Sequence, residues 1–366
     1  MTNPPLPSEL VLDRLSIPRS SIRNHSRIAT GGCGEIFKVE TVQETLVLKK
    51  FFKPSANGTS IATTLTTLNH PNVVRYRSYY IDPTDNVHYV TMDYVEGENL
   101  HQRQMKWRHA LSEGKDEDAG TMNEIRVILS QLAEGLRYLH DKGIVHRDLK
   151  PANVMVTTST TAALRVVIVD VDLMKEMQGS SNASPPDTKG KTPVYAAPER
   201  LKDRPTVGTS SDMWSFGCMA YEMCTLRRLF RCEGDVLTRT INGTDMDIPV
   251  MMNNALSPNR TLSLSKDFVN LVAALVGSTV KIDPQTRISA TEAINRLSPK
   301  HSTFRPDDGP MTGGSTTIRS DAFGLSSAAT TTTATDFAAV RQQLADFYGR
   351  EKYRHMQTVF LPRDIP

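Results

Sequence analysis

Three residues close together in the sequence have the types and spacing needed for phosphoryl transfer. Asp148 is followed by Lys150 two positions later and by Asn153 five positions later. A carboxylate can accept a hydroxyl proton, an ammonium group can contact the transferred phosphate, and an amide oxygen can bind a metal ion. The alternative is a charged surface turn in which Asp148 and Lys150 form an exposed pair. The complete run 144–153, between a helix that ends in glycine and a β-type segment, favours phosphoryl transfer.

The elements that would position this run are helices and short strands. One long helix precedes it, since apolar side chains repeat at helical spacing until Gly143 stops the helix. The repeating positions are Ile125, Leu129, Leu132, Leu136 and Leu139. Asp212 is expected to cap the start of a second helix. Two further helices are predicted over residues 266–275 and 290–297, and two short strands over 154–157 and 165–169.

The preceding part of the chain is rich in β-forming residues. Short runs of Val, Tyr, Phe and Leu between turn residues predict a small, mostly antiparallel sheet. The runs cover residues 35–40, 45–52, 73–80 and 87–94, and one helix is predicted over residues 60–68. The fold class is therefore α+β, with units at 28–95 and 96–298. We expect residues 1–27 to be a disordered leader and residues 299–366 to be a low-complexity tail with one terminal helix.

Composition limits the class of protein. The 366 residues carry 43 basic and 40 acidic side chains, and a net charge of +3 gives no sign of a nucleic-acid partner. The run 268–280 is too short and too polar to span a membrane. The cysteines have no zinc-binding spacing and are expected to be buried thiols; they are Cys33, Cys218, Cys224 and Cys232. We expect a cytoplasmic protein, with the nucleus as the alternative location.

The run His146–Asn153 resembles the catalytic loop of eukaryotic protein kinases, and Lys150 resembles the serine/threonine branch of that family. The resemblance extends over about residues 28–297. It implies a bilobal fold with a small antiparallel β-sheet N-lobe and a larger, mainly helical C-lobe. It also implies ATP and Mg²⁺, with Asp148 accepting the substrate proton, Lys150 at the γ-phosphate and Asn153 as a metal ligand.

The segment 28–36 resembles the glycine-rich loop of the family, in which backbone N–H groups approach phosphates without interference from a Cβ atom. Alanine replaces the first glycine. The resemblance implies nucleotide contacts from Ala29, Gly31, Gly34 and Ile36.

The segment 46–50 resembles the strand whose lysine binds the α- and β-phosphates. It implies Val47 at the adenine and Lys49 at the phosphates, with Lys50 as the alternative lysine. Residues 92–97 resemble the hinge, which implies contacts to adenine from Met92, Asp93 and Val95.

The run 167–173 stands where the family has its metal-binding Asp-Phe-Gly. The apolar residues before Asp170 fit a buried strand that delivers one carboxylate to Mg²⁺. Val171 replaces the phenylalanine and Asp172 replaces the glycine, which implies about 1 kcal/mol of backbone strain at Asp172. Asn153 and Asp170 are the metal ligands that the resemblance implies.

Two structural motifs of the family also have counterparts in this chain. Ala197–Glu199 resembles the end of the activation segment, and Asp283–Arg287 resembles its partner. The resemblance implies an ion pair between Glu199 and Arg287, and it implies that Asp212 anchors the backbone of the catalytic loop.

One family residue is missing. Active members pair the strand lysine with a glutamate on the N-lobe helix, and that position falls on Ile61. No Asp or Glu occurs between Glu44 and Asp82. The loss corresponds to about 2–3 kcal/mol, or about 30- to 150-fold in rate. Asp172 or a residue of a flexible segment is the expected substitute.

The resemblance leaves three functions open. The favoured one is a serine/threonine protein kinase, of full or reduced activity, that transfers the γ-phosphate of ATP to protein hydroxyls. A pseudokinase that acts as a nucleotide-sensing or scaffolding module is the alternative, supported by Ala29, Ile61, Val171 and Asp172. A small-molecule kinase comes third, because such enzymes usually lack the Ala197–Glu199 motif.

The expected partners follow from the same resemblance. They are a protein substrate with a Ser or Thr acceptor and an upstream activating kinase. Arg147, which precedes the catalytic-loop aspartate, is expected to receive a phosphate on the following segment. The candidate hydroxyls are Ser180, Ser181, Ser184 and Thr188. No nucleic-acid or membrane partner is expected, and nothing in the sequence sets an oligomeric state.

Overall fold

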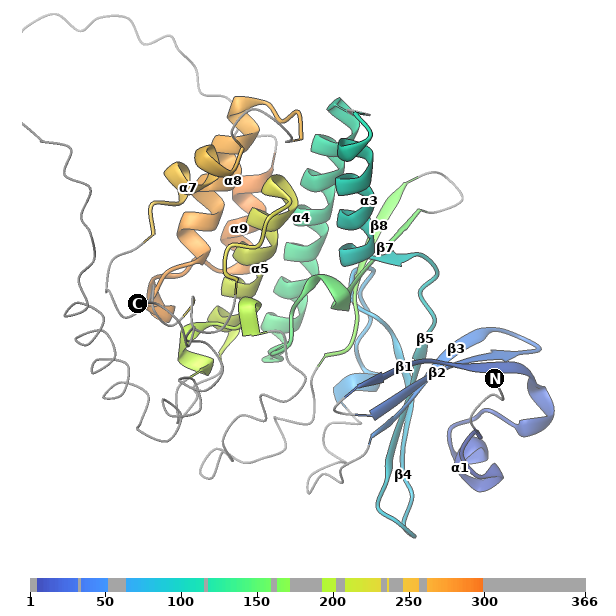
Figure 1. Cartoon of the computed structure of the whole chain (residues 1–366). Coiled ribbons are helices and arrows are strands. Elements are labelled where there is room, and N and C mark those ends of the chain that lie inside the picture. The colour runs from blue at the N-terminus through green and yellow to red at the C-terminus, as the bar shows by residue number, and fades with distance from the viewer. Residues whose placement is uncertain are drawn as a thin grey trace, which may run out of the picture. The chain divides into compact units, whose positions relative to one another are not determined.

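The computed structural model describes residues 5–31, 34–51, 64–114, 118–158, 163–171, 193–201, 208–231, 236, 246–256 and 262–298. These residues form an antiparallel sheet followed by a mainly helical region, which confirms the predicted α+β class (Figure 1). The predicted low-complexity tail, Ile61, Asp172, Cys33, Cys232 and the four candidate phosphorylation sites lie outside the described residues.

The sheet has five strands in the order β1-β2-β3-β5-β4, and all neighbours are antiparallel. They are β1 (Ile22–Gly31), β2 (Gly34–Thr41), β3 (Thr45–Phe51), β4 (Tyr76–Ile81) and β5 (His88–Asp93). The sequence predicted β2 to β5 within a few residues. It missed β1, which is mostly polar and forms one edge of the sheet. A helix was predicted over residues 60–68. Residues 64–68 of this range are described, and residues 64–66 are helical.

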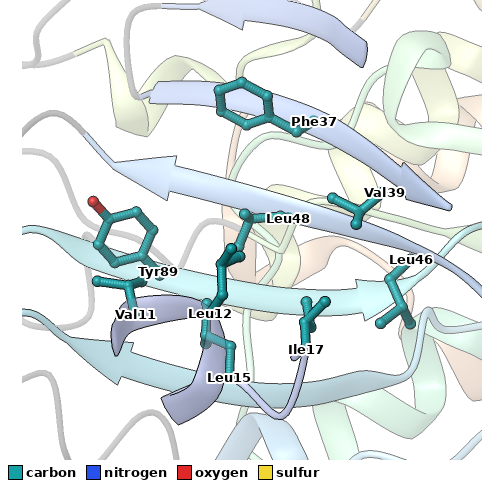
Figure 2. Packing of buried hydrophobic residues seen from close by; sticks show 9 residues of the cluster. All are labelled: Val11, Leu12, Leu15, Ile17, Phe37, Val39, Leu46, Leu48 and Tyr89. Carbon is teal, nitrogen blue, oxygen red and sulfur yellow. The ribbon is translucent and has the colours of Figure 1, made fainter. Parts of the chain in front are cut away.

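The prediction of a disordered leader was wrong for the described residues before 28. Helix α1 (Glu9–Arg14) and the one-turn helix η1 (Arg19–Ser21) precede β1. Apolar side chains of α1 and the turn after it pack on one face of the sheet (Figure 2). The cluster contains Val11, Leu12, Leu15, Ile17, Phe37, Val39, Leu46, Leu48 and Tyr89, all at most 6% exposed. Each buried aliphatic side chain contributes about 1.5–3 kcal/mol, so four of them outweigh the neighbouring prolines and serines that suggested disorder.

The opposite face of the sheet carries the predicted nucleotide-binding side chains. Neighbouring residues of a strand point to opposite faces, and residues paired across strands share a face. Ile36 pairs with Lys49, and Val47 pairs with Met92 on the next strand. Since Leu46 and Leu48 face α1, Val47 and Lys49 must face away from it. The α1 cluster therefore lies on one face of the sheet, and the candidate nucleotide-binding side chains lie on the other.

The described residues of the second region contain a three-stranded sheet and six helices of eight or more residues. The strands, in the order β6-β7-β8, are β6 (Glu98–Asn99), β7 (Val154–Thr158) and β8 (Leu164–Ile168). The helices of eight or more residues among the described residues are α3 (Leu100–Ser112), α4 (Asp118–Asp141), α5 (Thr209–Thr225), α7 (Ile248–Ala255), α8 (Lys266–Thr279) and α9 (Ala290–Leu297). One-turn helices are η2 (Pro151–Asn153), η4 (Pro193–Tyr195), η5 (Pro198–Arg200) and η6 (Pro284–Thr286). Helices α4, α5, α8 and α9 pack on one another (Figure 1).

Helix α4 confirms the strongest sequence signal. The five predicted apolar positions of its stripe are fully buried, and Gly143 follows the helix at φ +71°, a left-handed value that favours glycine. Helices α3 and α7 were not predicted. α3 has few apolar residues, and its start is held by a capping box in which Asn99 and Gln102 exchange side-chain hydrogen bonds with the backbone.

Candidate active site

The run 144–153 connects α4 to η2 and β7 and brings three predicted side chains together. Lys150 Nζ donates to Asp148 Oδ2 at 2.7 Å. Asn153 Nδ2 donates to the backbone oxygen of Asp148 at 2.7 Å and to Asp148 Oδ2 at 3.2 Å. We call Asp148, Lys150 and Asn153 the Asp148 cluster. Asp148 retains 26% of its side-chain exposure, so a substrate group can reach the carboxylate.

A buried carboxylate anchors the backbone of this run. Asp212, 1% exposed, accepts hydrogen bonds from the backbone N–H of His146 at 2.8 Å and of Arg147 at 3.0 Å. It also accepts from His140 Nε2 at 3.0 Å. Burial acts to raise the pKa of Asp212, but the hydrogen bond and charge of His140 outweigh it and hold this pKa below its ordinary value. The anchoring role of Asp212 is confirmed.

The expectation that Asp212 caps α5 was wrong, and one residue of the site, His140, was not expected. Asp212 does not cap the helix, because α5 begins at Thr209 after the N-cap residue Gly208. The Asp212 side chain bonds to the run 144–153 instead of to its own helix. His140 was not identified from the sequence; the only signal was a histidine in the last turn of α4, where a cation favours the helix dipole.

Asp170 lies beside the Asp148 cluster. It comes two residues after β8, and the preceding residue, Val169, donates its backbone N–H to the backbone oxygen of Asn153 at 3.0 Å. The backbone oxygen of Val169 accepts from His146 Nε2 at 3.1 Å. Asp170 itself has φ +60°, so the left-handed conformation falls on this residue. The strain predicted at Asp172 lies outside the described residues.

Lys49 reaches Asp170 from the sheet. Its Nζ forms an ion pair and hydrogen bond with Asp170 Oδ1, and the whole residue is 8% exposed. Partial burial acts to raise the pKa of Asp170, but the charge and hydrogen bond of Lys49 outweigh it and hold this pKa below its ordinary value. The charges of His146 and Lys150 act in the same direction. Asp170 therefore supplies a carboxylate to Lys49, whereas the expected substitute Asp172 lies outside the described residues.

The alternative lysine lies on the other face of the sheet. Lys50 Nζ is 4.0 Å from Glu35 Oε2, and 35% of its side chain is exposed. Because β3 alternates, only one of the two adjacent lysines can face Asp170. This geometry favours Lys49 as the phosphate-binding lysine.

The remaining candidate residues occupy strands β1, β2, β3 and β5. Ala29 pairs with Ile36, and Gly31 pairs with Gly34 where β1 turns into β2. A Cβ atom at Gly34 would lie 2.0 Å from the backbone oxygen of Lys50, so β2 can approach β3 there only with glycine. The structure therefore brings this hairpin against β3 at its glycine end.

The hinge candidates lie at the end of β5 and just beyond it. Met92, 6% exposed, ends a row with Val47 on the face that carries Lys49. The carboxylate of Asp93 forms an ion pair with Arg77, and its backbone N–H donates to the backbone oxygen of Arg75 at 2.9 Å. Val95 lies just beyond the strand and is half-buried.

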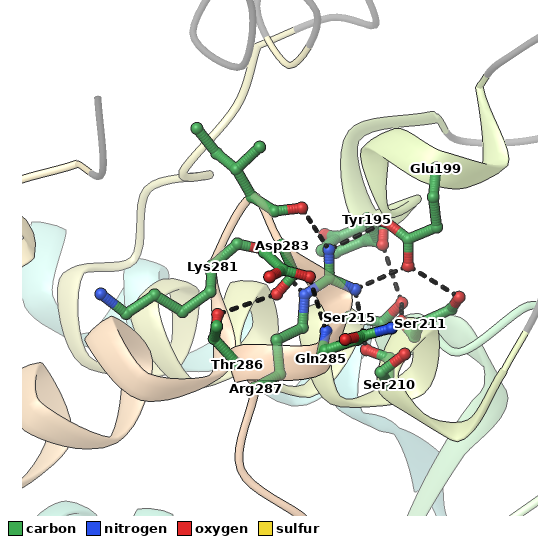
Figure 3. A network of polar contacts seen from close by, with 11 residues as sticks. Tyr195, Glu199, Ser210, Ser211, Ser215, Lys281, Asp283, Gln285, Thr286 and Arg287 are labelled. Carbon is green, nitrogen blue, oxygen red and sulfur yellow. Dashed lines mark hydrogen bonds and ion pairs between the residues drawn. The ribbon is translucent and has the colours of Figure 1, made fainter. Parts of the chain in front are cut away.

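The ion pair between Glu199 and Arg287 is confirmed (Figure 3). Arg287 Nη1 and Nη2 donate to the two carboxylate oxygens of Glu199 at 2.6 and 2.8 Å. The side chains are 0% and 6% exposed. Arg287 Nε also donates to the backbone oxygen of Lys281 at 2.8 Å, and Ser211 Oγ donates to Glu199 at 2.9 Å. This network joins η5, α5 and the segment before α9.

The donor atoms next to Asp148 fit a hard divalent cation. The lowered pKa of Asp170 keeps its carboxylate ionised, and both hydrogen bonds of the Asn153 side chain use its nitrogen, which leaves the amide oxygen for a metal ion. Mg²⁺ typically takes one or two protein oxygens and completes its shell with phosphate and water. Within the described ranges, no group of three or more His, Cys, Asp or Glu is arranged to hold a metal alone. These two side chains therefore fit a cation whose remaining ligands come from a bound phosphate group and water.

Comparison with known proteins identifies the family. Residues 22–297, more than half of the chain, match the family described as "Protein kinase domain". The chain therefore belongs to the protein kinase family. Within the described part of the chain, none of the helices combines the length and apolar character that crossing a membrane requires.

Similar curated proteins are serine/threonine-protein kinases. The chain is 37% identical over 166 residues to serine/threonine-protein kinase D1044.8 of Caenorhabditis elegans. The aligned residues cover 44% of this chain and 15% of that protein. It is 32% identical over 225 residues to SSN3 of Coccidioides immitis, covering 56% of this chain and 45% of that protein. It is 28% identical over 197 residues to Nek4 of Mus musculus, covering 53% and 23%. The matched part is less than half the length of each relative.

Proposed function

We propose that this chain is a serine/threonine protein kinase that transfers the γ-phosphate of ATP to hydroxyl groups of proteins. The observation that carries the proposal is the position of the Asp148 cluster beside the Lys49–Asp170 pair. These groups supply a proton acceptor, two cations and two metal-binding oxygens within one small region. The family match and the serine/threonine kinase relatives support the same reaction.

Each residue has a separate role in the proposed mechanism. The Asp148 carboxylate would accept the proton of the substrate hydroxyl as the hydroxyl oxygen attacks the γ-phosphorus, while the bond from that phosphorus to the β,γ-bridging oxygen breaks and ADP leaves. Lys150, bonded to the same carboxylate, stabilises the negative charge of the transferred phosphate. Asn153 and Asp170 would hold Mg²⁺, which would neutralise charge on the ATP phosphates.

The sheet would hold the nucleotide above this cluster. Lys49 would bind the α- and β-phosphates, and the hairpin Ala29–Ile36 would cover them with backbone N–H groups. Val47 and Met92 share the Lys49 face and would contact the adenine. The backbone groups of Asp93 and Val95 would bind its edge. Main-chain contacts at the hinge need no particular side chain, which is compatible with the engagement of the Asp93 carboxylate by Arg77.

A pseudokinase is the second candidate, and the Lys49–Asp170 ion pair is the observation that favours it. In the proposed enzyme Asp170 must bind Mg²⁺ as well as contact Lys49, and no glutamate on the N-lobe helix can take over the lysine. If the pair persisted with nucleotide bound, the metal would lack a ligand. A kinase that must loosen this pair is expected to be slower by about 30- to 150-fold.

The test compares two adjacent lysines. Purified wild type, Lys49→Met and Lys50→Met are incubated with Mg-ATP carrying a labelled γ-phosphate and a generic basic protein. We expect Lys49→Met to lose about 100-fold or more in transfer, because a buried cation is removed, and Lys50→Met to stay within about two-fold. A larger loss in Lys50→Met would contradict the assignment. Stabilisation by Mg-ATP without any transfer would support the pseudokinase.

The proposed partners are a protein with a Ser or Thr acceptor and an upstream kinase that phosphorylates the segment after Asp170. The candidate hydroxyls of this segment lie outside the described residues. The proposed phosphorylation is therefore supported by the sequence resemblance and by Arg147, which precedes Asp148. The proposed location is the cytoplasm, with the nucleus as the alternative.

A further inference from the structure

Tyr76 reaches the Asp170 region from strand β4. It is the first residue of the strand, is 3% exposed and pairs with Met92 of β5. Its hydroxyl oxygen accepts a hydrogen bond from the backbone N–H of Val171 at 3.2 Å. Val171 directly follows Asp170, so the hydroxyl is bonded to the residue next to the carboxylate that contacts Lys49.

The backbone around Asp170 requires support. Its φ of +60° is uncommon for a residue other than glycine. On the preceding side, Val169 is held by hydrogen bonds to Asn153 at 3.0 Å and to His146 at 3.1 Å. On the following side, the hydroxyl of Tyr76 holds the next N–H group. The left-handed residue is thus fixed through both of its neighbours.

The Tyr76 hydroxyl is suited to this contact because it remains neutral. Burial raises the pKa of Tyr76, and the charge of Asp170 raises it further. A neutral hydroxyl accepts the Val171 N–H without placing a second negative charge beside Asp170. Phenylalanine at this position would fill the same space and leave the N–H without this acceptor.

We infer that Tyr76 is a positioning residue for Asp170: by holding the Val171 amide, its hydroxyl fixes the direction in which the Asp170 carboxylate points. The inference rests on the proposed function, in which that carboxylate binds Mg²⁺ beside ATP. Tyr76 acts through the backbone and is not itself among the proposed metal ligands.

The first test measures the contact itself and needs no nucleotide. Amide hydrogen exchange is followed by NMR on protein with isotope-labelled valine, for wild type and Tyr76→Phe. The Val171 amide is expected to exchange about five-fold faster or more in the variant, because it loses its acceptor. The Val169 amide, bonded to Asn153, serves as the internal reference and should keep its rate.

The second test measures the consequence for the metal. Thermal stabilisation by a fixed concentration of ATP is titrated with Mg²⁺. In Tyr76→Phe the Mg²⁺ concentration that gives half of the stabilisation should rise about five-fold, equivalent to about 1 kcal/mol at 1.4 kcal/mol per decade. A merely structural role would lower the melting temperature in every condition without moving this midpoint.

Tyr79→Phe is the matched control. Tyr79 lies on the same strand, and its hydroxyl bonds to His88 Nδ1 at 2.5 Å instead of to the backbone next to Asp170. It should change neither Val171 exchange nor the Mg²⁺ midpoint. Unchanged exchange at Val171 in Tyr76→Phe, or equal effects in Tyr79→Phe, would overturn the inference. Absence of any Mg-ATP response in the wild type would reject the proposed function, whereas the exchange rates would still decide whether Tyr76 holds this backbone.

Discussion

Removal of the buried guanidinium at Arg287 should destabilise the helical region strongly. Arg287→Met keeps most of the side-chain length and replaces the cation by an apolar thioether. The carboxylate of Glu199, 6% exposed, would then remain buried with the hydroxyl of Ser211 as its remaining described donor. Leaving the Glu199 charge buried without a partner costs more free energy than the loss of its attraction to Arg287.

The magnitude follows from the contacts that are lost. Arg287 donates two hydrogen bonds to Glu199 and one each to the backbone oxygens of Lys281, Ser210 and Ile282. Breaking a buried pair by removing one partner costs about 3–5 kcal/mol. The exposed pair of Arg137 and Glu134 on α4, with side chains 40% and 36% exposed, should contribute no more than about 0.5 kcal/mol. Arg137→Met is therefore the matched control.

Urea unfolding followed by far-ultraviolet circular dichroism measures both variants. A double variant, Glu199→Met with Arg287→Met, separates the two costs because it removes the stranded carboxylate as well. We expect the double variant to be at least as stable as Arg287→Met alone. A loss below about 1 kcal/mol in Arg287→Met, or additive losses in the double variant, would refute the reasoning.

Three further predictions concern the sheet and the packing of α5. Leu12→Ala should cost about 2–5 kcal/mol in urea unfolding, since Leu12 is fully buried against the sheet; stability equal to wild type would mean that α1 does not pack there. Burial lowers the pKa of His88, so as the pH falls this histidine is protonated in the unfolded chain before it is protonated in the folded protein. The free energy of unfolding should therefore decline as the pH falls below about 6.5 and through the lowered pKa. His88→Gln should reduce that decline between pH about 7.5 and 5.5, and an unchanged slope would exclude His88 as its source. Gly217→Ala should destabilise by about 1–3 kcal/mol because its Cβ would lie 2.2 Å from Thr279 Oγ1, whereas Gly120→Ala, with nothing within 4 Å, should be neutral or stabilising in the same measurement.

The parts of the fold that could be predicted have a strong repeating pattern. The apolar stripe of α4 and its terminal glycine located that helix, and α9 was predicted with its observed bounds behind Ser289. Helix α1 could not be predicted, because six residues are too few to show a period and its stability comes from the sheet beneath it. Helix α3 was missed for a related reason, since its capping box and not an apolar stripe marks its start.

The candidate site was predictable where its residues are close in sequence. The spacing of Asp148, Lys150 and Asn153 was sufficient to propose their cluster. The choice between Lys49 and Lys50 needed the register of β3, and the pairing of Lys49 with Asp170 joins residues 121 positions apart. Such a contact depends on how the sheet approaches the helical region, which no local pattern encodes. The same holds for Tyr76, whose hydroxyl contacts the backbone 95 positions away.

The most direct test of the proposed reaction is phosphate transfer by wild type and Asp148→Asn at saturating Mg-ATP, with Mg-ATP thermal stabilisation measured on the same samples. Asparagine keeps the shape of the side chain but cannot accept the substrate proton. We predict that Asp148→Asn retains the stabilisation and loses about 100-fold or more in transfer, the range of a general base. Equal transfer by both proteins, or no stabilisation of the wild type by Mg-ATP, would contradict the account.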